Sequence, residues 1–261
     1  MRRRAEPRGR ARRAVAGFVL VLGLSLLALQ LTEGRGTKAT FPDRPNDAME
    51  QPIGQPPTVR DEGTYQFVRT QPKDDNEPVT YDPCAPIHVV VNERTAVPGA
   101  DGIVRQAVDS VSDATGLAFV LDGRTDRRPD DERQTTADPQ GVRSWRPVLI
   151  SWSDPDETPA LKGPVAGVGG STAVRRDGHE WFVTGGVTLD GPQLRQLLRS
   201  EAGRTSVRAV VMHELGHLVG LDHVKDRGEL MYATGSEDVT EWGPGDRAGL
   251  AALGGGECID Y

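Results

Sequence analysis

Cysteine is almost absent from this sequence, and lysine and aromatic residues are scarce. Two cysteines in 261 residues exclude a cysteine-rich zinc ribbon, an iron–sulfur ferredoxin and a disulfide-dense miniprotein. Only 4 of the 31 basic residues are lysine, a bias that we attribute to a GC-rich coding sequence. With 5% aromatic and 36% hydrophobic residues, the chain can form a core, but its composition is not that of a multispanning membrane protein.

The net charge of −7 is unevenly distributed. Residues 1–13 carry seven arginines and one glutamate, so the rest of the chain carries a net charge of −13. A nucleic-acid-binding surface would be basic, so this acidic body argues against nucleic acid as a partner. The arginines instead precede an apolar segment, where basic residues set membrane topology.

Residues 14–31 contain no charged side chain, and only Ser25 and Gln30 are polar. This length is near the minimum for a transmembrane helix and exceeds that of a secretory h-region, and no clear cleavage site follows. We therefore expect a single-pass signal anchor in the cell membrane, with residues 1–13 in the cytoplasm and the remainder outside. A cleaved signal peptide, which would give a secreted protein, is the alternative, and a buried core helix is a third.

Residues 32–62 have no apolar periodicity and are rich in proline (Pro42, Pro45, Pro52, Pro56 and Pro57). Such a composition buries too little surface to offset its ordering entropy, so we expect a disordered stalk, with a propeptide as the alternative. Residues 63–261 are predicted to form one folded domain.

Alternating β-rich and helical patterns follow within that domain. They predict a hairpin from 64–70 and 78–82, and strands at 86–92, 117–123, 147–153, 165–174 and 181–189. Helices are predicted at 100–115, 192–200, from Thr205 or Ser206 to about Gly220, and at Pro244–Leu253. This order predicts an α/β or α+β fold with a partly parallel sheet.

Three of the five histidines fall in one short segment, VVMHELGHLVGLDHV, at residues 210–224. His213 and His217 are four residues apart, so on a helix they share a face and can form two corners of a tetrahedral zinc site. Glu214 is displaced around the helix and can reach water at the metal rather than the metal itself. Gly220 can end the helix with a positive φ, which would let His223 turn back as a third ligand.

The residues alone leave other assignments open. Glu237 or Glu241 as the third ligand would indicate a different clan of zinc peptidase, and Asp222 could replace His223. Glu214 could also be a solvated helix carboxylate or the remnant of an inactive enzyme.

The motif HExxHxxGxxH at residues 213–223, followed by Met231, resembles the metzincin zinc endopeptidases, closest to their matrixin-like branch. Residues 181–190 resemble the strand before the active-site helix of this family, and residues 245–253 resemble its C-terminal helix. The resemblance covers about residues 84–261. It implies a zincin-like fold with a twisted five-stranded mixed sheet and long helices, and a cleft beneath the strand near residues 165–174.

The resemblance also implies roles for individual residues. His213, His217 and His223 would bind one catalytic Zn²⁺, and Glu214 would activate the water that attacks the peptide bond. The two remaining histidines, at positions 88 and 179, are too few and too scattered to suggest a second zinc site.

Met231 would form a hydrophobic floor under the metal, and Tyr232 would help to wall the pocket for the residue after the scissile bond. Val224 replaces the serine that matrixins carry after the third histidine, which leaves the subfamily open. Cys84 and Cys258, at the two ends of the domain, are predicted to form a disulfide, with two free thiols or a regulatory Cys84 as alternatives.

The sequence therefore predicts a monomeric, extracytoplasmic zinc metalloendopeptidase that acts on peptide or protein substrates. Acidic clusters at 130–132 and 154–157 could bind Ca²⁺, but their spacing matches no calcium site and solvated loop charge is the preferred interpretation. The competing hypotheses are a cell-wall peptide hydrolase and a non-catalytic, zinc-stabilised surface binding domain. Glu214 argues against the binding domain, because a structural zinc site closes its fourth position with a protein ligand.

Overall fold

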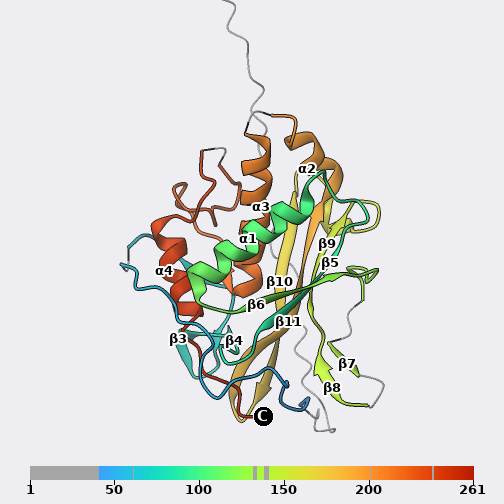
Figure 1. Cartoon of the computed structure of the whole chain (residues 1–261). Coiled ribbons are helices and arrows are strands. Elements are labelled where there is room, and N and C mark those ends of the chain that lie inside the picture. Colours follow the sequence, from blue (N-terminus) through green and yellow to red (C-terminus); the bar gives the residue numbers. More distant parts are fainter. Residues whose placement is uncertain (1–40, 61, 132–133, 138–140, 201, 237) are drawn as a thin grey trace, which may run out of the picture.

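A mixed sheet with helices packed on one face forms the centre of the molecule (Figure 1). The computed structural model describes residues 41–60, 62–131, 134–137, 141–200, 202–236 and 238–261. The main path of the sheet runs β10–β11–β9–β5–β6. These strands are β5 (Ile87–Asn92), β6 (Phe119–Arg124), β9 (Val148–Ser153), β10 (Gly167–Arg176) and β11 (His179–Asp190). All neighbours on this path are parallel except β10, which runs antiparallel to β11 at the edge of the sheet. The predicted partly parallel α/β sheet is confirmed.

Short strands account for the differences from the predicted topology. β4 (Thr80–Tyr81) pairs in parallel with β11, which gives the sheet six strands where five are expected. A strand of two residues is too short to show a period-two pattern in the sequence. The other short strands are β1 (Gln66–Phe67), β2 (Thr70–Gln71), β3 (Asp74–Pro78), β7 (Thr135–Ala137), β8 (Arg143–Trp145) and β12 (Leu221–Asp222). The expected hairpin is reduced to β2 and β3, because β1 pairs with β12 and β4 joins the main sheet.

Two long helices pack beside each other against the sheet (Figure 1). The helices are α1 (Ala100–Thr115), α2 (Gly191–Leu197), α3 (Gly203–Val219) and α4 (Pro244–Leu253), with a 3₁₀ turn at Pro159–Leu161. α1 buries one apolar stripe and ends at Gly116, whose φ of 75° is left-handed. From Val207 onward α3 is almost wholly buried, because it contacts α1, β10 and β11. α3 begins before the predicted cap residues Thr205 and Ser206.

Part of the predicted stalk contacts the domain. Residues 41–60 form no helix or strand, but the backbone N–H of Met49 donates to the Cys84 carbonyl (2.7 Å) and that of Ile53 to the Pro83 carbonyl (3.0 Å). Asp47 lies 2.7 Å from Nε2 of His88, whose Nδ1 contacts Asp122 at 2.9 Å. The predicted segments 1–13 and 14–31 lie outside the described residues, and the predicted domain boundaries stay predictions.

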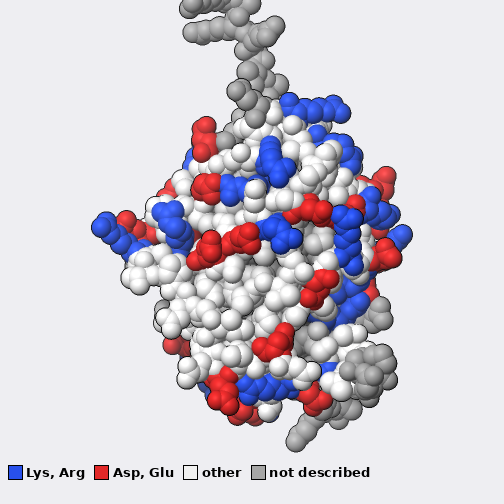
Figure 2. All heavy atoms as spheres, viewed as in Figure 1, with Lys and Arg blue, Asp and Glu red and all other residues white. Residues whose placement is uncertain are grey.

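The predicted single-pass membrane location requires correction. Within the described ranges, no helix is long and apolar enough to cross a bilayer. The longest of these helices, α3, has 17 residues and includes Arg204, Arg208 and Glu214, whereas a span needs about 20 predominantly apolar residues. Charged side chains of both signs are interspersed on the face shown in Figure 2.

The two cysteines form a disulfide, as predicted. Cys84 and Cys258 are 174 residues apart in sequence, and their Cα atoms lie 5.4 Å apart. The bond excludes the alternatives of two free thiols and of a regulatory Cys84 thiol. It ties the segment after α4 to the start of β5.

Removing this disulfide should destabilise the domain. The double variant Cys84→Ser/Cys258→Ser should lose up to about 5 kcal/mol of unfolding free energy, because its unfolded chain is no longer closed into a long loop. Urea unfolding with and without a reductant measures this loss. The reductant should lower the midpoint of the parent and leave that of the double variant unchanged; an equal response of both proteins would contradict the prediction.

Candidate metal centre

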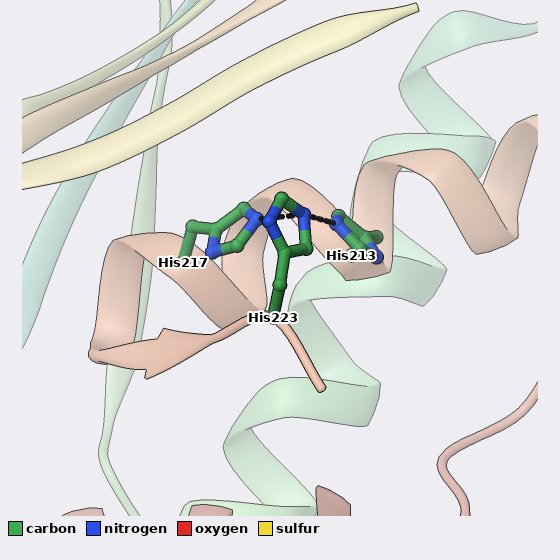
Figure 3. A group of neighbouring side chains, drawn as sticks. All are labelled: His213, His217 and His223. Atoms are coloured by element: carbon green, nitrogen blue, oxygen red, sulfur yellow. Dashed lines mark hydrogen bonds between the residues drawn. The ribbon is translucent and has the colours of Figure 1, made fainter. Parts of the chain in front are cut away.

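The three histidines of the motif meet at one point (Figure 3). α3 carries His213 and His217 one helical turn apart, and His223 follows β12. Nε2 of His223 lies 3.1 Å from Nε2 of His213 and 3.1 Å from Nε2 of His217. A tetrahedral zinc ion with Zn–N bonds of about 2.0–2.1 Å would separate its nitrogen ligands by about 3.3 Å. The spacing of the imidazoles therefore fits a zinc ion.

Backbone carbonyls orient two of the imidazoles. Nδ1 of His213 lies 2.7 Å from the Leu230 carbonyl oxygen, and Nδ1 of His217 lies 2.8 Å from that of Leu221. Because a carbonyl can only accept, each Nδ1 carries the proton and each Nε2 offers its lone pair to the cluster.

Burial keeps the histidines neutral, which is the form that binds metals. It lowers the pKa of His217 to about 3 and that of His213 well below the usual range, with a further contribution from the neighbouring imidazoles. Burial also lowers the pKa of His223, although this residue is partly exposed. The folded chain therefore presents three unprotonated nitrogens near neutral pH.

A strand from the N-terminal part of the domain holds the turn between α3 and His223. At Gly220 φ is 126°, which ends the helix, and its carbonyl accepts a 2.9 Å hydrogen bond from the backbone N–H of Val68. β1 then pairs antiparallel with β12, with Phe67 opposite Leu221. The predicted role of Gly220 as a helix stop agrees with this geometry, but the pairing with β1 was missed because no local motif marks it.

Glu214 is buried beside the histidines but is not part of their cluster. Its relative exposure is 0%, and neither carboxylate oxygen has a hydrogen-bond partner among the described residues. Burial raises the pKa of Glu214 to about 8. A buried carboxyl without a partner is costly, so its presence here indicates a role that packing alone does not explain.

The side chain of Met231 packs against α3. It is 1% exposed, and a Cβ added at Gly216 would lie 2.7 Å from its sulfur, so its side chain packs directly on α3. Tyr232 is partly exposed, and the Arg227 guanidinium lies 5.7 Å from the centre of its ring.

Two buried carboxylates hold the Met231 segment, and the sequence motif did not reveal them. Asp246 accepts hydrogen bonds from the backbone N–H groups of Leu230 (2.5 Å), Met231 (3.3 Å) and Gly243 (2.9 Å). The Glu229 carboxylate in turn accepts hydrogen bonds from the backbone N–H groups of Gly245 and Asp246, both at 2.9 Å. Asp246 thus fixes the peptide group whose carbonyl orients His213.

Two of the three alternative third ligands, Asp222 and Glu241, lie outside the histidine cluster. Glu241 pairs with Arg208, and one oxygen of Asp222 accepts from the backbone N–H of His223 at 2.7 Å. Glu237 lies outside the described residues.

The other candidate ligand groups have protein partners elsewhere in the structure. Nε2 of His179 lies 3.0 Å from Nε2 of Gln71, and His88 contacts Asp47 and Asp122. In the acidic clusters considered for Ca²⁺, Glu157 pairs with Arg94 and Arg128, and Asp131 with Arg146.

Replacing Asp246 with Asn should change how stability depends on pH. Burial, with a contribution from the charge of Glu229, raises the pKa of Asp246 from 3.8 to about 6. Between these two pH values the folded state holds a proton that the unfolded state has released. The contribution of this carboxyl to stability is therefore greatest below pH 3.8 and is lost as the pH rises to about 6.

Urea unfolding of the metal-free parent and of Asp246→Asn, at several pH values from about 4 to 7, measures this effect. The unfolding free energy of the variant should fall less steeply with rising pH than that of the parent. Equal slopes for the two proteins would contradict the assignment.

Comparison with known proteins gives a family match in sequence and remote similarities in structure. None of the curated proteins matches the chain. An archaemetzincin from Methanopyrus kandleri is 17% identical, with 64% of this chain and 93% of that chain covered and a TM-score of 0.38. Metalloproteinase-II from Bacteroides fragilis is 13% identical, with 73% of this chain and 57% of that chain covered and a TM-score of 0.33. The family model for matrixin matches residues 151–253, which include β10, α3, the three histidines and Met231. The segment that carries the motif is therefore similar to the matrixin family.

Proposed function

We propose that this protein is a zinc endopeptidase that works outside the cytoplasm. The observation that carries the proposal is the convergence of three neutral imidazoles beside a buried carboxyl that does not join them. The matrixin match supports a metallopeptidase in general.

His213, His217 and His223 would hold the zinc ion, because their Nε2 atoms converge and backbone carbonyls engage Nδ1 of the first two. A zinc ion bound there supplies an electrophile for the substrate carbonyl and lowers the pKa of water. Three protein ligands leave one position open, as in catalytic rather than structural zinc sites. The donor set therefore favours catalysis over a purely structural site.

Glu214 would act as the general base and then as the general acid. Its carboxylate oxygens are free of hydrogen bonds to the described residues, so they remain available to a water molecule. Beside a bound zinc ion Glu214 would be ionised, because a nearby positive charge favours the carboxylate form. Glu214 then takes a proton from the attacking water and passes it to the nitrogen of the leaving amine. Burial strengthens these interactions because the surroundings screen charge weakly.

The substrate would lie along β10 as an added strand. β10 is the terminal strand of the sheet path and packs against α3, so its backbone edge lies beside the motif. An extended peptide could pair with that edge through main-chain hydrogen bonds. Met231 would support the metal site from below, and Tyr232 would line the pocket for the residue after the scissile bond.

The disulfide supports the proposed compartment. Disulfides persist in oxidising environments and are rare in the cytoplasm of most organisms. The bond between Cys84 and Cys258 therefore favours function outside the cytoplasm.

Replacing Glu214 with Gln should abolish proton transfer while leaving the three histidines in place. We expect the rate of peptide cleavage to fall by about 10²–10⁴-fold. The zinc content should stay at that of the parent. Cleavage of an unbiased peptide library by the purified protein, with zinc measured by atomic absorption, checks both expectations.

Glu257→Gln is the matched control. Glu257 is exposed, and among the described residues its one hydrogen bond is that of its backbone carbonyl with the indole N–H of Trp181. This variant should cleave at the parental rate. Undiminished cleavage by Glu214→Gln would overturn the mechanism, and zinc binding without any cleavage by the parent would favour a binding domain.

A further inference from the structure

Strand β10, which packs against α3, has glycines at the two positions that face Glu214. In β10, Gly167 and Gly169 are buried and alternate with the partly exposed Val168, so both glycines lie on the face toward α3. Neither has a positive φ, so the backbone at these two positions does not require glycine. Glycine weakens a strand, and its presence inside one marks a close approach by another group.

Each glycine faces a different part of Glu214. A Cβ added at Gly167 would lie 2.7 Å from Cγ, 3.0 Å from Cδ and 3.0 Å from Oε1 of Glu214. A Cβ added at Gly169 would overlap the carbonyl oxygen of Glu214 and lie 2.9 Å from its carbonyl carbon. Gly167 therefore limits the space of the carboxyl side chain, whereas Gly169 limits the distance between the strand and the helix backbone.

Packing is what places the carboxylate in this structure. Both oxygens of Glu214 lack a hydrogen-bond partner in the described part of the chain, so no donor there fixes their direction. The helix that carries the side chain is buried around this residue, which leaves its backbone little room to adjust. The backbone of Gly167 is thus the surface that limits where the carboxylate can lie.

We propose that Gly167 is a positioning residue that sets the location of the Glu214 carboxylate, and that Gly169 sets the approach of β10 to α3. The inference rests on the proposed function, because the position of Glu214 matters for the rate only if Glu214 transfers protons. A displacement of about 1 Å in a catalytic group can reduce a rate about 10²-fold.

The first test is the kinetics of Gly167→Ala with zinc bound. The three atoms nearest to the added methyl group all belong to Glu214 and none to a histidine, so zinc content should equal that of the parent. We expect kcat to fall by at least about 10-fold, with KM within about twofold, because the change affects the chemical step more than binding. A kcat within about twofold of the parent would overturn the proposal.

The second test is a double-mutant cycle on stability, which does not depend on activity. Glu214→Ala removes Cγ, Cδ and Oε1, the three atoms nearest to the new methyl group. The lowering of the urea midpoint by Gly167→Ala should therefore disappear in the Glu214→Ala background. An equal lowering in both backgrounds would show that Gly167 acts through another contact and would overturn the proposal. If Gly167→Ala alone does not fold, the double variant should still fold.

Two further alanine variants complete the set. Gly169→Ala should lower the urea midpoint in both backgrounds, because its methyl group meets the helix backbone, which Glu214→Ala retains. Gly255→Ala is the control: Gly255 is exposed, its φ is not positive, and its nearest contact for a Cβ is 3.5 Å away. This variant should match the parent in kcat and in midpoint. The parent could cleave no peptide while the effect of Gly167→Ala on the urea midpoint still disappears in the Glu214→Ala background. That result would refute the proposed function but support the contact between Gly167 and Glu214.

Discussion

The candidate metal centre depends on two hydrogen bonds from histidine Nδ1 atoms to backbone carbonyls. The carbonyls of Leu230 and Leu221 fix the tautomer and the ring orientation of His213 and His217, respectively. Both carbonyls belong to segments outside α3. A helix can place two imidazoles on one face, but it cannot determine which nitrogen of each ring points outward. The rest of the site can therefore be understood as the means of holding those two carbonyls in place.

Each carbonyl is held by a different part of the chain. The segment with Leu230 is fixed by Asp246 at the start of α4, and Leu221 lies in β12, paired with β1. The disulfide then ties the segment after α4 to the start of β5. Segments before and after the motif thus support the site, although the residues that would contact a metal directly all lie in one short segment.

The sequence predicted the features that are local. The helical spacing of His213, Glu214 and His217, the helix stop at Gly220 and the strands of the main sheet each follow from a pattern within about a dozen residues. The pairing of β1 with β12 and the role of Asp246 could not be predicted, because they depend on which distant segments meet. The single-pass membrane location was an inference from residues 14–31, and the described part of the chain contains no helix that supports it.

The pairing of Phe67 with Leu221 has a consequence for the order of folding. Contacts between residues far apart in sequence form late in folding. The intervening chain must lose conformational entropy to close the loop before the contact stabilises it. His223 follows directly after β12, so its final position depends on such a contact, whereas α3 alone brings His213 and His217 onto one face. We therefore expect zinc to bind a chain that has already folded, unlike in a zinc finger, where the metal itself drives folding.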